Sequence, residues 1–416
     1  MDKMKDMPYK IGITLRIFPS YKQKDIIAIN DGASRFIYNK LVARGKEIHN
    51  LKQVTIYCQP IHDRLDYLYS LGTTPKELKA AYPFLADERI DAQCIANAVK
   101  NYNTSWKNYR ERPEMGSPTF HKKGYEQQYQ TNAHYGANAK YINDGNVHLL
   151  DKNHIQLPKL GGIRFACSDW MADIFQRTNE TRIGSIKIWR NNIGEYYATL
   201  QVGSVEPFHK ALPKTGTSVG IDVNIENLYT DSDGNIVPNP KFKKNRQKTL
   251  SKHQKKLSRK YESAKKRKAP LRDAKNYQKQ RLKTAKTQLR ISRQREEYIQ
   301  IISKNIVKSH DNIYVEKLNV KNMMKNHHLA YSISDCAWGT FAGKLEYKAA
   351  LYGKNFSRVP AKNTTQTCSA CGYILKDNQK LTLDVREWEC PHCHKFHSRD
   401  HNAAINILHK GLRLSA

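Results

Sequence analysis

The chain has 416 residues, 39% of them hydrophobic, which allows two to four domains with cores of their own and excludes a disordered tail. Its 71 Lys and Arg outnumber its 38 Asp and Glu, and the resulting net charge of +33 needs a polyanionic partner. We expect nucleic acid and exclude a membrane, because no run approaches 18 apolar residues and no signal peptide is recognisable.

The first part of the chain predicts a strand followed by a helical block. Residues 8–18 alternate as a strand does, and after Ser20, the expected N-cap, the spacing becomes helical. Helical patterns continue to about residue 112 and carry scattered cations: Arg35, Lys40, Arg44, Lys46, Lys107 and Arg110.

Residues 115–205 have a different texture, with short strands punctuated by Gly and Asn. The segments HIQLPKLGGIRF, IGSIKIWR and EYYATLQVG predict a small β-barrel or sandwich, which the strand at 8–18 could join. The stretch EPFHKALPKTG is typical of a linker before the next domain.

Residues 241–300 contain 23 Lys or Arg and 4 Asp or Glu, so they supply +19 of the net charge. One interpretation is a solvated or disordered basic tail. Against it, apolar side chains on both sides of Pro270 keep the rhythm of an amphipathic helix: Leu250, Leu257, Tyr261 and Ala264, then Leu282, Leu289 and Ile299. Two basic helices broken near Pro270 would neutralise phosphates without reading bases.

Three isolated acids lie on three predicted elements. SVGIDV predicts a strand with Asp222 on the face opposite its apolar residues, followed by a hairpin through 228–230 and a DSDG turn. NIYVE predicts a short buried strand that ends at Glu316. Asp400 stands where the helix DHNAAINILHKGL begins, and we expect that helix to bury Ala404, Ile407, Leu408 and Leu412.

Singly, each acid has an ordinary explanation, since an Asp before a helix is more often an N-cap than a ligand. Their order is more specific: a first-strand Asp before a hairpin, a later strand-end Glu and a last-helix Asp resemble the layout of the RNase H-like nuclease fold. In that fold three acids bind two Mg²⁺ ions, which activate water and stabilise the leaving oxygen of a phosphodiester.

Eight cysteines without a secretory signal favour a reducing cytoplasm, where Cys-x-x-Cys pairs bind metal more often than they form disulfides. Cys368 with Cys371 and Cys390 with Cys393 have the spacing of a four-cysteine zinc ribbon. Because a closed Cys₄ shell leaves no open coordination position, we expect this zinc to be structural. The ribbon would then be an insertion that leads the chain into the helix of Asp400.

Six segments resemble the successive motifs of a known family: VGIDVNIENLYTDSDG, VEKLNVKNM, LAYSISDCAWGTFAGKLEYKAALYG, NTTQTCSACG, REWECPHC and HSRDHNAAINIL. They are similar to those of TnpB proteins, the IS200/IS605-type transposon-encoded RNA-guided DNA endonucleases ancestral to type V CRISPR Cas12 effectors. The N-terminal segments resemble the family as well. By position in the motifs, Asp222, Glu316 and Asp400 match the acids of its RuvC nuclease site, and the four cysteines match its zinc ribbon. Asn224 stands where the family usually has Gly.

The resemblance implies a multidomain α/β architecture. Residues 1–20 and 115–212 would form a β-rich wedge domain of the barrel type, and residues 21–114 a helical recognition domain. Residues 213–364 and 395–416 would form the RNase H-like RuvC domain, into which the zinc ribbon at 365–394 is inserted.

The resemblance also implies a function, the cleavage of double-stranded DNA next to a short target-adjacent motif. A guide RNA of the omega type would pair with the target, and one RuvC site with two Mg²⁺ would cut both strands. The helix with Arg35, Tyr38, Asn39 and Lys40 is a candidate reader of the motif, or simply a packed surface helix. We expect a cytoplasmic, nucleoid-associated protein of a bacterial or archaeal cell.

Other functions stay open at this point. A nuclease-inactive RNA-guided repressor would carry a broken acidic triad, and an RNase H-fold transposase or recombinase would bind transposon ends without RNA. A compact CRISPR effector would have the same fold. A zinc-ribbon scaffold alone would leave the carboxylates unexplained.

Overall fold

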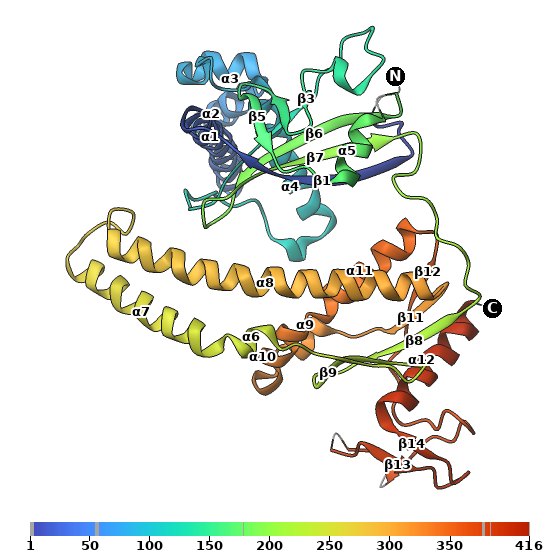
Figure 1. Ribbon diagram of the computed structural model, residues 1–416. Helices are drawn as coiled ribbons and strands as arrows, with labels where there is room; N and C mark the ends of the chain where they lie inside the picture. Colours follow the sequence, from blue (N-terminus) through green and yellow to red (C-terminus); the bar gives the residue numbers. More distant parts are fainter. Residues whose placement is uncertain (1–3, 55–57, 178, 377–378, 383, 416) are drawn as a thin grey trace. The chain divides into compact units, whose positions relative to one another are not determined.

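The computed structural model describes residues 4–54, 58–177, 179–376, 379–382 and 384–415. They form two compact units, Met1–Phe208 and His209–Ala416 (Figure 1). Residues 1–3, 55–57, 178, 377–378, 383 and 416 lie outside the described residues. Of these, 377–378 and 383 belong to the expected zinc ribbon. None of the described helices is long and apolar enough to cross a lipid bilayer.

The first unit contains a seven-stranded antiparallel sheet in the order β2-β6-β7-β1-β5-β4-β3. Its strands are β1 (Tyr9–Phe18), β2 (Gln127–Asn132), β3 (His148–Asp151), β4 (His154–Leu157), β5 (Gly161–Phe165), β6 (Thr181–Arg190) and β7 (Tyr196–Ser204). β1 pairs with β7 over most of its length and with β5 at its end, which confirms that the first strand joins the later β-rich segment. Ile13, Leu15 and Ile17 of β1 alternate into the core of this sheet.

Helices accompany this sheet: α1 (Tyr21–Lys52), α2 (Gln59–Ser70), α3 (Pro75–Ala81), α4 (Ala92–Glu111) and α5 (Asp169–Gln176). The Ser20 N-cap of α1 is confirmed, with a capping box to Gln23. α4 begins only at Ala92, after the Asp91 cap, so the helical prediction is wrong for the residues just before it. α5 interrupts a segment predicted as strands alone, and it buries Ile174 and Phe175 against the sheet core.

The second unit is a mixed α/β structure around a five-stranded sheet in the order β10-β9-β8-β11-β12. The strands are β8 (Ser218–Val223), β9 (Asn227–Asp231), β10 (Ile236–Pro238), β11 (Asn312–Glu316) and β12 (Asn355–Val359). β8, β11 and β12 are parallel, whereas β9 pairs antiparallel with β8 and β10. The hairpin predicted after Asp222 is therefore confirmed.

The helices of this unit are α6 (Phe242–Asn245), α7 (Gln247–Lys266), α8 (Lys275–Ser309), α9 (Val320–Met323), α10 (His327–Cys336), α11 (Trp338–Leu351) and α12 (Arg399–Ser415). α7 and α8 lie side by side and are separated around Pro270, as predicted (Figure 1). The disordered-tail interpretation is wrong, because these helices pack on each other and the end of α8 contributes Ile299 and Val307 to the core under the sheet.

A short ribbon, β13 (Glu387–Glu389) with β14 (Phe396–Ser398), leads directly into α12. Ala404 and Ile407 are buried and Leu408 is partly buried, as predicted, but Leu412 is 43% exposed, so the prediction is wrong there. Gly411 takes the place of Leu412 in the buried stripe, because a β-carbon at Gly411 would lie 2.1 Å from the ring of Tyr314. Only a residue without a side chain fits against that ring.

Candidate carboxylate and metal sites

Asp222 and Glu316 lie on neighbouring parallel strands. Ile221 of β8 is paired with Val315 of β11, so the next residue on each strand is an acid. Ile221 and Val315 face the core shared with α8 and α11. Since side chains alternate along a strand, both carboxylates lie on the opposite face of the sheet.

Helix α12 covers that opposite face. Gly220, two residues before Asp222, lies so close to the helix that a β-carbon would be 2.2 Å from the carbonyl oxygen of Ala404. At the other end Gly411 meets Tyr314, two residues before Glu316. These two close approaches hold α12 against β8 and β11, and the charges of Asp400 and Glu316 both act on the carboxyl of Asp222.

Asp400 is a residue of the first helical turn and not the N-cap, because α12 begins at Arg399. Its carboxylate accepts a hydrogen bond of 3.1 Å from the guanidinium of Arg399 and one of 3.3 Å from the side-chain amide of Asn224. The guanidinium of Arg386 lies 3.7 Å away. Asn224, which stands where TnpB proteins usually have Gly, is therefore in contact with the third acid.

The pKa values record how closely the acids are gathered. Burial raises the pKa of the Asp222 carboxyl well above its usual range, and the negative charges of Glu316 and Asp400 raise it further. Burial also raises the pKa of Glu316, against the effect of a 2.5 Å hydrogen bond from the hydroxyl of Thr364. A cation among these groups would relieve both the repulsion and the desolvation.

The donor set fits a hard divalent cation, since Mg²⁺ prefers carboxylate oxygens. Among the described residues, however, only the four cysteines bring three or more ligand atoms of His, Cys, Asp or Glu within 4.8 Å of one another. The carboxylate oxygens of the three acids are therefore not all within that distance of one another in this structure.

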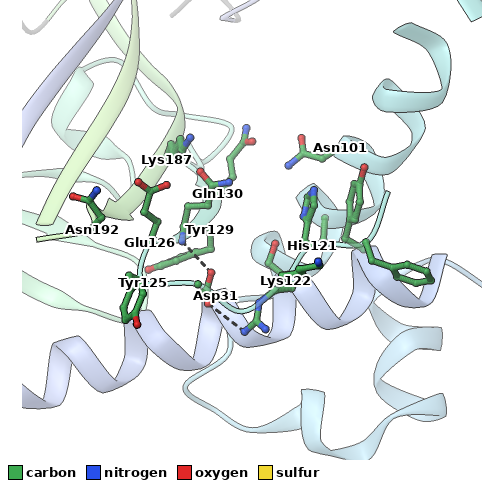
Figure 2. Close-up of a pocket in the computed structure, with 17 residues that line it drawn as sticks. Asp31, Asn101, His121, Lys122, Tyr125, Glu126, Tyr129, Gln130, Lys187 and Asn192 are labelled. Carbon is green, nitrogen blue, oxygen red and sulfur yellow. Dashed lines mark hydrogen bonds and ion pairs between the residues drawn. The ribbon is translucent and has the colours of Figure 1, made fainter. Parts of the chain in front are cut away.

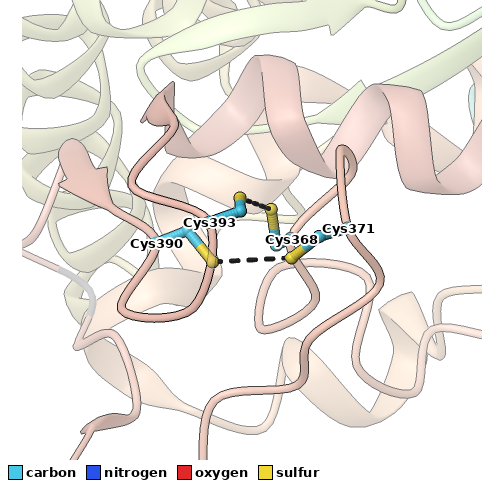
Figure 3. A group of neighbouring side chains, drawn as sticks. All are labelled: Cys368, Cys371, Cys390 and Cys393. Atoms are coloured by element: carbon cyan, nitrogen blue, oxygen red, sulfur yellow. Dashed lines mark hydrogen bonds between the residues drawn. The ribbon is translucent and has the colours of Figure 1, made fainter.

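The cysteine cluster has the geometry of a tetrahedral metal site (Figure 3). The sulfur atoms of Cys368 and Cys393 are 3.7 Å apart, as are those of Cys371 and Cys390. For zinc–sulfur bonds of about 2.3 Å, a tetrahedron places its sulfur atoms about 3.8 Å apart. The structure thus brings together all four cysteines that the sequence predicts as ligands, and they can bind a structural metal such as zinc.

Three polar side chains near α12 tie the cysteine cluster to the acid site. The amide of Asn402 donates to the carbonyl of Thr367 and accepts from the backbone N–H of Ser369, on either side of Cys368. Asn406 donates to the carbonyls of Thr364 and Thr367. His397, the middle residue of β14, has its imidazole 3.1 Å from the sulfur of Cys368. One helix therefore carries Asp400 and fastens the first cysteine loop.

Sequence comparison finds matches for both halves of this site. A family model described as "Probable transposase" matches residues 199–327, and one described as "Cas12f1-like, TNB domain" matches residues 338–407. A protein of Streptomyces pristinaespiralis called "Putative RNA-guided DNA endonuclease" is 27% identical over 412 residues, covering 98% of this chain and 90% of that protein. TnpB-like protein L79 of Acanthamoeba polyphaga mimivirus is 32% identical over 118 residues, 27% of this chain and 22% of that protein. The chain is thus similar in sequence to TnpB-like proteins and to proteins called RNA-guided DNA endonucleases.

The fold of the chain is also similar to that of a solved structure. The protein in a cryo-EM structure of a Cas12f1–sgRNA–target DNA complex superposes with a TM-score of 0.51 at 14% sequence identity, covering 96% of this chain and 98% of that one. The expected mixed α/β architecture with several sheets is confirmed.

The N-terminal unit has a pocket of about 670 Å³ (Figure 2). Arg35 and Tyr38 of α1 line it, but Arg35 is paired with Asp31 at 3.4 Å and the ring of Tyr38 stacks on His121 with centroids 3.9 Å apart. Asn39 exchanges two hydrogen bonds with the backbone of His121. Arg35, Tyr38 and Asn39 of the helix expected to read the motif are therefore already bound to other residues of this unit. Lys122, Glu126 and Lys187 also line the pocket.

Sequence reasoning did not find the residues that support the site. Asn402 and Asn406 lie one turn apart on α12 and are nearly inaccessible to solvent. Two amides one turn apart in a predicted buried stripe could have indicated side chains that hydrogen-bond to a neighbouring loop. Nothing local marks Arg386, whose contact with Asp400 depends on the fold of the ribbon.

Proposed function

We propose that this protein is an RNA-guided endonuclease that cuts guide-complementary double-stranded DNA beside a short target-adjacent motif. Asp222, Glu316 and Asp400 would form its Mg²⁺-dependent RuvC site. The observation that carries the proposal is the gathering of these acids from β8, β11 and α12 on one face of the sheet, where burial and then the charges of Glu316 and Asp400 raise the pKa of Asp222. Such a cluster of partly buried acids is unfavourable without a cation, and all three acids are present, which argues against a nuclease-inactive repressor.

The topology supports an RNase H-like nuclease domain. An antiparallel β8–β9–β10 meander is followed by β11 and β12, which continue the sheet in parallel from β8. The acids occupy the first strand, the fourth strand and the last helix. Three carboxylates can together hold two cations, which in two-metal sites lie about 3.5–4 Å apart.

Each residue of the site has a role in the reaction. The three carboxylates would hold Mg²⁺, which when bound activates water and stabilises the leaving oxygen of the phosphodiester. Thr364 fixes the rotamer of Glu316 through its 2.5 Å hydrogen bond. Asn224 and Arg399 hold the carboxylate of Asp400 at the start of its helix.

We propose that the cysteine cluster holds a structural zinc and that α12 transmits its order to the acid site. A four-sulfur shell leaves no position for substrate. Since Asn402 and Asn406 bind the loop of Cys368, a folded cluster fixes the helix that carries Asp400.

The partners follow from the charge and from the relatives. The basic helices α7 and α8 present cations suited to phosphates, as a guide RNA or an RNA–DNA heteroduplex requires. A full-length relative is called an RNA-guided DNA endonuclease, and the structural neighbour is bound to a guide RNA and target DNA. The β-rich and helical parts of the N-terminal unit would act as wedge and recognition domains, and the pocket near Arg35 is our candidate for reading the motif.

One family model is described as a transposase, so strand transfer is the second candidate function. A transposase would bind transposon ends without RNA. The decisive experiment is to purify the protein from cells, extract and sequence any bound RNA, and test cleavage of a plasmid that matches its guide segment, with Mg²⁺ and with EDTA. We expect a bound RNA of roughly 100 nucleotides or more, since a charge of +33 needs a large polyanion. RNA-free protein that binds transposon ends and joins them would support the transposase instead.

A further inference from the structure

A pocket of about 440 Å³ lies in the C-terminal unit, and the function proposed above does not use it. It is lined by the turn after β8, the segment from β10 to α7, helix α10 and the ribbon that follows the first cysteine pair. Its residues are Ile225, Glu226, Asn239, Lys241, Lys244, Gln247, Tyr331, Ser332, Asp335 and Arg386. A pocket of this size can hold one nucleotide of a single strand but is too small for a duplex.

Arg386 joins this pocket to the acid site. One arm of its guanidinium lies 3.1 Å from the carboxylate of Glu226, and another lies 3.7 Å from Asp400. The side chain keeps 52% of its surface exposed, so it retains donors for a further partner. A strand lying in the pocket would therefore continue to the acids.

The lysines at the pocket are held in place by the backbone. Lys241 adopts a left-handed conformation with φ of 50°, which is rare for a residue with a side chain, and its N–H donates to the side chain of Asn239. The buried carboxylate of Asp335 accepts the backbone N–H groups of Lys243 and Lys244. Backbone strain maintained by such contacts is typical of binding sites.

The acids of the pocket are paired with arginines and leave the charges of Lys241 and Lys244 uncancelled. Asp335 is fully engaged, since besides the two backbone groups it pairs with Arg295 at 3.2 Å. Glu226 is paired with Arg386. The ammonium of Lys243 lies 4.2 Å from the ring centre of Tyr331, whose shielded hydroxyl has no hydrogen-bond partner among the described residues. A polar ligand could supply that partner.

We propose that this pocket binds one nucleotide of the single-stranded DNA that runs into the acid site. Lys241, Lys244 and Arg386 bind its phosphates, and the side chains of Asn239, Gln247 and Tyr331 contact its sugar and base. The proposal rests on the proposed nuclease function, and it adds where the strand to be cut is held. The contacts are to phosphate and to one base, so binding is expected to tolerate any sequence.

The test measures binding without cleavage and without a guide. Protein carrying Asp222→Ala is titrated into fluorescent pentathymidylate, which is too short to pair stably, and fluorescence anisotropy gives the Kd. Adding Lys241→Asn and Lys244→Gln should raise the Kd about tenfold or more, because charge-assisted hydrogen bonds to phosphate are removed. Asn tolerates the left-handed backbone, which protects the fold. If the double variant melts early, Lys244→Gln alone carries the test.

The matched control is Lys304→Gln with Lys308→Gln, two exposed residues of α8 outside the pocket with the same change in charge. Its Kd should stay within about twofold of the parent. An equally weakened control, or an unchanged Kd in the pocket variant, would overturn the proposal. Tighter binding of pentauridylate, weakened by the same pocket variant, would assign the pocket to RNA and overturn it too.

Failure of the nuclease function would look different. In that case, protein with wild-type acids would not cut guide-matched DNA, but the pocket variant would still bind pentathymidylate more weakly than the control variant does. This pair of results would refute guided cleavage and still support the pocket as a nucleotide-binding site.

Discussion

Gly220 of β8 lies directly against the backbone of Ala404 in α12, because a β-carbon at Gly220 would be 2.2 Å from the carbonyl oxygen of Ala404. Backbone atoms cannot turn away as a side chain does, so Gly220→Ala must push the helix off the sheet. We expect the variant to lose about 1–3 kcal/mol of stability or more. Because the same helix carries Asp400, nuclease activity should fall further than the unfolded fraction explains, as assays below the melting temperature would show.

Gly343 of α11 offers a matched control, since no atom lies within 4 Å of the β-carbon it would gain. Gly343→Ala should keep full activity and gain roughly 0.5–1 kcal/mol from the higher helix propensity of Ala. Equal melting temperatures and equal activities for the two variants would show that α12 does not depend on the close approach at Gly220.

The triad gives the sharpest functional prediction. Asp222→Ala, Glu316→Ala and Asp400→Ala should each abolish Mg²⁺-dependent cleavage and change the affinity for guide RNA by no more than about twofold, because the basic surface binds the nucleic acid. Cleavage gels and filter binding on the same preparations separate the two properties. Glu346→Ala, at an exposed acid paired with Arg358, should cut normally. Guide-matched cleavage by Asp400→Ala at the unmutated rate would exclude Asp400 from the site.

Elemental analysis tests the metal assignment. We expect one zinc per chain and its loss in Cys390→Ser, with a lower melting temperature and lower cleavage together, because Asn402 and Asn406 connect the cluster to the helix of Asp400. Cys167→Ser, at a cysteine of the N-terminal unit, should retain the zinc and the activity. Active protein without zinc would contradict the assignment.

Local patterns predicted the elements of the site better than their connections. The alternation around Asp222 and the rhythm of α7, α8 and α12 are each set by neighbouring residues, so they could be read from the sequence. The register that places Ile221 beside Val315 joins strands 94 residues apart, and no local pattern encodes it. The gathering of the acids was expected only through the order of the elements and the family resemblance.

The errors have the same origin. Leu412 continues the apolar rhythm of α12, but the ring of Tyr314 leaves space only for Gly411, so the stripe shifts by one residue. α5 is short enough that its eight residues give a weak helical signal within a β-rich segment. In both places tertiary packing decided between patterns that the sequence left nearly equal.

A buried lysine gives a prediction for pH. Lys348 of α11 donates to the carbonyl of Gln300 at 2.5 Å and to the hydroxyl of Ser303 at 2.9 Å, and burial lowers its pKa to about 8. Between pH 8 and about 10.4, the ordinary lysine value, the unfolded chain binds more protons, so this residue's contribution to stability increases with pH. Lys348→Met does not titrate, and its stability relative to the wild type should therefore decline by about 1–3 kcal/mol from pH 7 to pH 10 in urea unfolding. A difference that stays constant with pH would show that Lys348 is not forced toward its neutral form.

The basic helices should bind nucleic acid through charge alone. Lys252, Lys256 and Arg259 are exposed on one stripe of α7, and replacing all three with Gln removes three positive charges without touching the core. We expect weaker guide-RNA binding and a logarithmic salt dependence flatter by about one unit for each phosphate that is no longer neutralised, equally for every guide sequence. Exchanging Lys for Arg and Arg for Lys at the same positions keeps the charge and should keep the affinity. A change in guide preference would instead mean that this stripe reads bases, because phosphates carry no sequence information.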